Sequence, residues 1–165
     1  MMSKVWRKRL IRKLAEMGGL DMDGDKMSVQ KVGLKEWADI EGGAIRVHEV
    51  KEAVIYDNGI TTPKHVPSLR ILVEYANKGS APLKFRLSQW TLFDTEGFMY
   101  EFELRNQFYE DDAPRKLREA ICAPQQHVKG WVAFQPTAEA VPSYVQFRLH
   151  YMTSAVVNID LGKLR

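Results

Sequence analysis

An alternation of apolar and polar residues with a period of two is the feature that most constrains the fold of this chain. It is clearest over residues 69–76, where Leu69, Ile71, Val73 and Tyr75 take the odd positions and Arg70 and Glu74 fall between them. Successive side chains of a β-strand point to opposite faces, so this spacing predicts a strand with one buried face. Similar patterns bring the expected total to about eight strands. The other seven segments are 34–40, 44–55, 83–92, 98–104, 128–134, 145–151 and 155–161.

Turn-forming residues separate these segments. Gly42-Gly43 predicts a tight hairpin between the first two strands, and residues 94–97 predict another turn. Residues 56–67 contain an Asn-Gly pair and two prolines, and they are expected to form a loop.

The apolar positions change parity at two places. One change lies between Val47 and Val50, and the other between Leu87 and Trp90. An extra residue in one strand reverses the direction of every side chain after it. We therefore predict a β-bulge at each place, where a strand can bend from one sheet to the other.

Many short strands with closely spaced turns are typical of a β-sandwich. We expect an all-β fold over residues 29–165, with two antiparallel sheets packed face to face and one short helix within residues 105–126. A chain of 165 residues suits one such domain, and its single cysteine, Cys122, excludes an intrachain disulfide. The predicted core comprises Ile71, Val73, Phe85, Phe102, Val132, Phe134, Phe147 and Leu149.

Residues 3–17 predict an amphipathic helix ahead of the sandwich. Trp6, Leu10, Leu14 and Met17 recur at helical spacing and share one apolar stripe. Ser3 is a suitable N-cap, and Gly18-Gly19 a suitable stop. Residues 1–28 would therefore be a basic amphipathic helix followed by a flexible hinge.

The positive charge of the chain lies in this first segment. Residues 1–17 contain six basic residues and one acidic residue, a net +5, whereas the whole chain is +3, so the remainder carries −2. Basic amphipathic helices contact anionic membrane surfaces or protein partners, and an acidic body disfavours nucleic acid as the partner. The stripe could equally pack on the sandwich and leave the basic side chains in solvent. The predicted contact residues are Trp6, Arg7, Lys8, Leu10, Arg12, Lys13 and Leu14.

Two aromatic residues are candidates for an outward-facing patch. Trp131 has the opposite parity to Val132, and Tyr144 the opposite parity to Val145. If the valines face the core, the two aromatic side chains face outward and could form a contact surface. The alternative is that other segments of the chain cover them.

The chain has no recognisable catalytic or metal-binding motif. Asp21, Asp23 and Asp25 alternate like calcium ligands, but the EF-hand template fails at its glycine and glutamate positions. A polar hinge is therefore favoured, and calcium binding is left open. The four histidines lack the spacing of a zinc site, although His127 and His150 could face each other across strands. We expect no cofactor, no metal and no enzymatic activity.

Four motifs occur in order along residues 30–151. Val32-Gly33 with residues 41–47 resembles an opening hairpin, and residues 69–83 resemble a strand that ends in an asparagine turn before a proline. Residues 90–100 resemble the pattern F-x-L-x-D-x-x-G-x-x-Y, and residues 127–134 end in G-x-V-x-F. Together they resemble a telokin-like, immunoglobulin-fold family of unknown function, common in prokaryotic lipoproteins and small secreted proteins. The resemblance implies an immunoglobulin-like sandwich with a binding or structural role.

Two functional hypotheses follow. The first is a non-enzymatic interaction or structural module, tethered through its basic helix to an anionic membrane surface or a protein partner. The second is a small-ligand-binding or hydrolytic domain with its site in loops 56–66 and 105–126. The basic start lacks the uninterrupted apolar run of a secretory signal, so we expect a cytoplasmic protein that is peripheral at the membrane if the helix binds lipid.

Overall fold

The computed structural model describes residues 28–58, 63–102, 120–150 and 155–162, with side chains except those of 53–58 and 63–67. The predicted helix at 3–17, most of the hinge and the part of the 105–126 helix before residue 120 lie outside this part of the chain. None of the described residues belongs to a helix long and apolar enough to cross a membrane.

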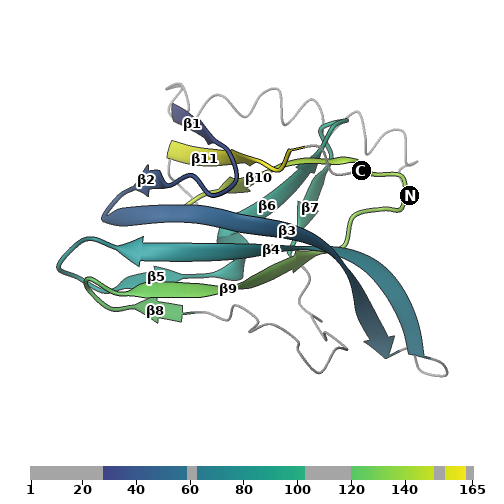
Figure 1. Cartoon of the computed structure of the whole chain (residues 1–165), viewed down its shortest axis with the longest axis horizontal. Helices are drawn as coiled ribbons and strands as arrows, with labels where there is room; N and C mark the ends of the chain where they lie inside the picture. The colour runs from purple at the N-terminus through teal and green to yellow at the C-terminus, as the bar shows by residue number, and fades with distance from the viewer. Residues whose placement is uncertain (1–27, 59–62, 103–119, 151–154, 163–165) are drawn as a thin grey trace.

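The described chain is built of strands (Figure 1). In order they are β1 (Ser28–Val32), β2 (Ala38–Ile40), β3 (Gly43–Asn58), β4 (Pro63–Asn77), β5 (Leu83–Phe85), β6 (Trp90–Asp94), β7 (Met99–Glu101), β8 (Ala120–Cys122), β9 (His127–Phe134), β10 (Pro142–Phe147) and β11 (Ala155–Asp160). A short 3-10 helix, Leu87–Gln89, joins β5 to β6.

The strands form two large sheets and one small sheet. The first has the order β1-β11-β10-β6-β7, the second β2-β3-β4-β9, and the third pairs β5 with β8. Apolar side chains from all three meet in one core cluster, so the fold is a β-sandwich. All eight predicted core residues contribute: six are buried, and Phe102 and Leu149 are partly buried against the cluster.

An aromatic group holds the layers together. Tyr75 of β4 stacks on Phe85 of β5, with ring centroids 3.7 Å apart. Its hydroxyl accepts a hydrogen bond of 2.5 Å from Nε1 of Trp90, at the start of β6. Tyr75 therefore connects the three sheets, and the bond satisfies two polar atoms that would otherwise be buried without a partner.

The structure corrects two sequence-based expectations. The sandwich is not wholly antiparallel, because β1 runs parallel to β11. Residues 56–58 and 63–67 are not loop: β3 and β4 pair from Asn58↔Pro63 inward. This hairpin continues beyond β9, whose pairing with β4 ends at Leu69↔Phe134, as a two-stranded arm (Figure 1).

The two predicted parity changes have different causes. The β3–β4 register shifts between Val47 and Glu49, which confirms the first bulge. At the second place the 3-10 helix Leu87–Gln89 replaces a bulge and carries the chain from the small sheet into the five-stranded sheet. The prediction of a bulge there is wrong, although the change of sheet is as expected.

A candidate ligand pocket beside the β6–β7 turn

The candidate site is built on the tight turn between β6 and β7. Asp94 ends β6, and its Oδ1 accepts hydrogen bonds from the backbone N–H groups of Glu96 (2.9 Å) and Phe98 (2.8 Å). The amide of Gly97 donates to the Asp94 carbonyl, and Gly97 has a φ of 84°. An aspartate that bonds its own backbone two residues on fixes such a turn, and glycine takes the left-handed position at no steric cost.

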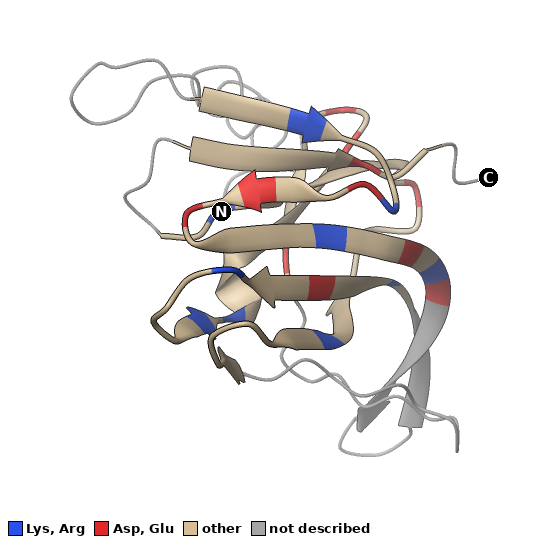
Figure 2. Cartoon of the chain, turned by 60° about the vertical axis from the view of Figure 1, so that its left-hand side comes forward, with Lys and Arg blue, Asp and Glu red and all other residues tan. Residues whose placement is uncertain are grey.

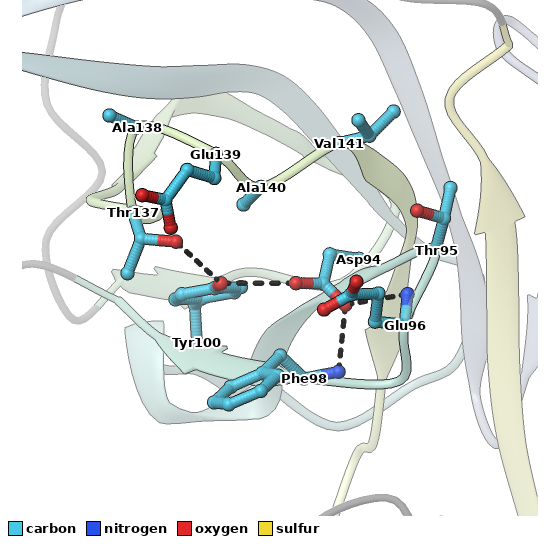
Figure 3. Close-up of a pocket in the computed structure, with 10 residues that line it drawn as sticks. All are labelled: Asp94, Thr95, Glu96, Phe98, Tyr100, Thr137, Ala138, Glu139, Ala140 and Val141. Carbon is cyan, nitrogen blue, oxygen red and sulfur yellow. Dashed lines mark hydrogen bonds between the residues drawn. The ribbon is translucent and has the colours of Figure 1, made fainter. Parts of the chain in front are cut away.

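Tyr100 of β7 places a hydroxyl group at the centre of the site (Figure 3). This hydroxyl donates to Oδ2 of Asp94 at 3.1 Å and lies 3.4 Å from Oγ1 of Thr137. Partial burial raises the pKa of Tyr100, and the hydrogen bond to the Asp94 carboxylate raises it further. Tyr100 is therefore a neutral hydrogen-bonding group at physiological pH.

The opposite wall is the segment that leads into β10. Its backbone is fixed to the turn by the Thr95 amide, which donates to the Val141 carbonyl at 2.9 Å. Between the wall and the turn lies a cavity of about 450 Å³, a volume that suits a small ligand. Its lining comprises Asp94, Thr95, Glu96, Phe98, Tyr100, Thr137, Ala138, Glu139, Ala140 and Val141.

The polar side chains that line the cavity mainly accept hydrogen bonds. The described residues of the lining include the carboxyl groups of Asp94, Glu96 and Glu139, and none of these described residues is a lysine, arginine or histidine. Figure 3 shows the carboxylates of Glu96 and Glu139 on opposite sides of the Tyr100 hydroxyl. The cavity therefore suits a ligand that carries positive charge or several hydrogen-bond donors.

The hydrogen bonds of Asp94 and Tyr100 give these two side chains a structural role in the turn. Both carboxylate oxygens of Asp94 already accept hydrogen bonds that hold the turn. A general base needs a pKa suited to taking a proton from its substrate, and Tyr100, whose pKa is raised, does not meet this condition.

A second polar cluster lies on the outer face of the four-stranded sheet. Glu74 is 8% exposed and accepts hydrogen bonds from Arg46 Nε (2.8 Å) and His48 Nε2 (2.9 Å), with His127 Nδ1 at 3.4 Å. The Arg46 guanidinium also lies 4.3 Å from the ring centroid of Trp37. Burial alone would raise the pKa of Glu74, but the three hydrogen-bonding partners outweigh it and lower that pKa.

This cluster is a compensated ion network rather than a metal centre. Arg46 and His48 donate hydrogen bonds to the same oxygen of Glu74, Oε1. Among the described residues, no group of three His, Cys, Asp or Glu side chains could hold a metal ion. His127 contacts Glu74 and Trp37, whereas the sequence suggested that it could face His150. Along β3, cationic and anionic residues alternate (Figure 2), so β3 does not present a uniformly basic strip.

The predicted aromatic patch does not exist as one surface. Trp131 lies on the outer face of the four-stranded sheet but is only 6% exposed, because Arg70 and Lys51 place their charged ends 4.9 and 5.7 Å from its ring centroid. Tyr144 lies on β10, in the other large sheet, and stacks on Phe93 at 4.8 Å. The low exposure of Trp131 agrees with the alternative that other parts of the chain cover it, and the two residues lie on different sheets and so do not share one contact surface.

Other predicted site residues fall largely outside the described chain. This applies to Trp6, Arg7, Lys8, Leu10, Arg12, Lys13 and Leu14, to Asp21, Asp23 and Asp25, and to residues 59–62 and 105–119 of the two candidate loops. The pocket lies elsewhere, at residues 94–100 and 137–141. Sequence reasoning found the turn and Tyr100, but no local pattern indicated that residues 137–141 would lie opposite them.

Comparison with known proteins shows the fold alone. No protein-family model matches the sequence, and no curated protein matches it either. Among solved structures, the chain is similar to the yjhA protein of Bacillus subtilis, with a TM-score of 0.58 and 15% identity over 78% of this chain and 99% of that one. It is also similar to MPT63, a secreted protein of Mycobacterium tuberculosis, with a TM-score of 0.56 and 11% identity over 78% and 95% of the two chains.

A third similar structure is that of ycdA from Bacillus subtilis, with a TM-score of 0.54 and 16% identity. The alignment covers 75% of this chain and 38% of ycdA, so this chain corresponds to part of that protein. Together with the sheets described above, these likenesses define the class of the molecule as a β-sandwich protein.

Proposed function

We propose that this protein is a non-enzymatic binding module whose ligand site is the pocket between the β6–β7 turn and residues 137–141. The observation that supports it is a cavity of about 450 Å³ whose lining, among the residues that the structure describes, has three carboxyl groups and no basic side chain. Its ligand would be a small organic cation, or a cationic side chain of a protein partner.

We assign the sandwich to the telokin-like immunoglobulin type as part of this proposal. The four motifs that carry the resemblance fall on the end of β1 with the start of β3, on β4 with its following turn, on β6–β7 and on β9. The asparagine turn is well formed: the Asn77 side chain donates to the carbonyls of Ala81 (2.8 Å) and Cys122 (2.9 Å) and accepts from Gly79 N–H. The asparagine of this motif therefore has a structural reason to occur where it does.

A titration with matched small molecules tests the pocket. n-Butylammonium should shift the backbone amide resonances of residues 94–100 and 137–141, whereas 1-butanol and butyrate should not. Glu139→Gln should weaken the amine by about 5- to 10-fold, since a charge-assisted contact of about 1 kcal/mol is lost. Glu101→Gln, a change at an exposed residue of β7 outside the pocket, is the control. Equal shifts with butyrate, or shifts elsewhere only, would contradict the proposal.

We also propose that the basic first segment supplies a second contact, with an anionic membrane surface or protein partner. The support is the division of charge, +5 on residues 1–17 against −2 on the rest. Full-length protein should sediment with vesicles of anionic lipid at low salt, and Lys8→Gln/Arg12→Gln/Lys13→Gln should not. A triple change at Lys31, Lys35 and Lys129 serves as the charge-matched control. If that control loses binding equally, the effect is one of net charge, and the segment has no special role.

A further inference from the structure

The outer face of the five-stranded sheet carries an apolar row near its β7 edge. Tyr144 of β10, Phe93 of β6 and Met99 of β7 are direct neighbours in the strand register. Tyr144 and Phe93 stack with their ring planes 6° apart. Met99 at the end of the row is 43% exposed.

This row points away from the core of the sandwich. Side chains alternate along each strand, and Leu92 and Val145 belong to the core cluster, so their neighbours Phe93 and Tyr144 face the other way. Even so, Phe93 is only 5% exposed. An outward apolar row of this kind is a surface on which another element packs.

We propose that the apolar stripe of the first segment, Trp6, Leu10, Leu14 and Met17, packs on the row Tyr144–Phe93–Met99. The place at which the described chain begins supports this. Residues 1–27 lead directly into β1, which is the edge strand of the same five-stranded sheet. The segment is therefore joined to this sheet at its β1 edge.

The length of the hinge allows the segment to reach the row. β7 lies four strand steps from β1, which is about 19 Å at about 4.8 Å per step. The row is also about 17 Å further along the strands than Ser28, because Ser28 pairs with Ala155 and Tyr144 with Asp160, so the combined separation is about 25 Å. Ten residues, 18–27, separate the stripe from β1, and an extended chain of ten residues spans about 33 Å. The hinge can thus cross the whole width of the sheet.

Charge around the row favours a basic segment. Asp160 pairs with Tyr144 in the register, and Glu101 follows Met99 on the same outward face of β7; both are exposed. A helix whose stripe lies on the row would bring basic side chains from its flanks close to these carboxylates. Its remaining basic side chains would face solvent, where they stay available to an anionic partner.

Site-specific photo-crosslinking in the full-length chain tests the packing directly. A benzophenone side chain at Leu14 should crosslink within the monomer to peptides containing residues 90–101 or 142–147. The same group at Arg12, on the polar face of the predicted helix, is the matched control and should give at most a few per cent of that yield. Crosslinks confined to dimers, to other surfaces of the sandwich or to added vesicles would overturn the proposal, as would the absence of a crosslink.

A mutational comparison checks the same contact without a bulky label. Leu14→Ser and Met99→Ser should each lower Tm by several degrees, and the double variant should lower it by less than the sum, since both remove one contact. Arg12→Ser should leave Tm within about one degree. Full additivity of the two changes would overturn the proposal. Its failure would leave the pocket titration unaffected, because Met99 is not among the described residues that line the pocket.

Discussion

At the scale of single residues, Asp94 shows how one side chain can shape both a turn and a pocket. It is 6% exposed and accepts two backbone hydrogen bonds and one from Tyr100. Asp94→Ala leaves these donors without a partner, so we expect a loss of about 2 to 4 kcal/mol in the free energy of unfolding. Urea unfolding monitored by tryptophan fluorescence measures it. Glu139→Ala, on the other wall of the pocket, should cost less than about 0.5 kcal/mol.

Glu74 gives a residue-scale prediction that depends on pH. Its pKa is lowered in the folded protein, so at acid pH the folded state binds fewer protons than the unfolded chain. The carboxylate therefore adds stability above its unfolded pKa of about 4.5 and loses this contribution as the pH falls through the lower folded value. The difference in unfolding free energy between wild type and Glu74→Gln should be constant near neutral pH and shrink below about pH 4.5. A difference that grows toward acid pH would contradict it.

At the scale of elements, the β6–β7 turn depends on the conformation of one glycine. Gly97 has a φ of 84°, where a Cβ is disfavoured. Gly97→Val should therefore lower the free energy of unfolding by more than about 1 kcal/mol. Gly33→Ala is a useful control because an added Cβ there would meet only ordinary contacts, at 3.7 Å or more from Glu36. If Gly97→Val and Gly33→Ala lowered the free energy of unfolding by similar amounts, the loss would not come from the positive φ of Gly97.

Strand positions were largely predictable because alternation is a local signal. The segments around Ile71, Val132 and Phe147 are strands, and their alternating residues are buried as expected. The sequence did not predict the arm formed by β3 and β4, because an Asn-Gly pair and two prolines normally end strands. Residues 56–58 and 63–67 are held extended by pairing with each other across the hairpin, and a local pattern does not report this pairing. The parallel pairing of β1 with β11 is likewise a contact between the two ends of the described chain.

The candidate site was predictable only in part, for the same reason. The Asp-x-x-Gly turn and Tyr100 form a short-range pattern, but the wall at residues 137–141 comes from 37 positions further along the chain, as the Tyr100–Thr137 contact shows. Trp131 shows the limit of parity arguments, which place a side chain on a face but do not say what covers it. Here Arg70 and Lys51 cover its ring.

At the scale of the whole molecule, the three sheets should unfold as one unit because they share a single buried contact. Tyr75 and Trp90 come from different large sheets, and Phe85 comes from the small one. Tyr75→Phe keeps the ring but leaves Trp90 Nε1 buried without an acceptor, which should cost about 1 to 3 kcal/mol. Fluorescence and far-ultraviolet circular dichroism should shift together in the variant. Separate transitions would show that the sheets are not coupled through this residue.

Alkaline pH gives a second, independent measure of the same contact. Complete burial raises the pKa of Tyr75 far above its usual value of 10, whereas in the unfolded chain the phenol ionises near 10. The folded state therefore holds a proton that the unfolded chain releases, so the stability of the wild type should fall as the pH rises above about 10. Tyr75→Phe removes that group and should lose less stability over the same interval. Tyr144→Phe, on the outer face and only partly buried, is the control and should follow the wild type more closely. If both variants lose stability with rising pH as steeply as the wild type, ionisation of Tyr75 does not cause the alkaline loss of stability. Other titrating groups would then be its cause.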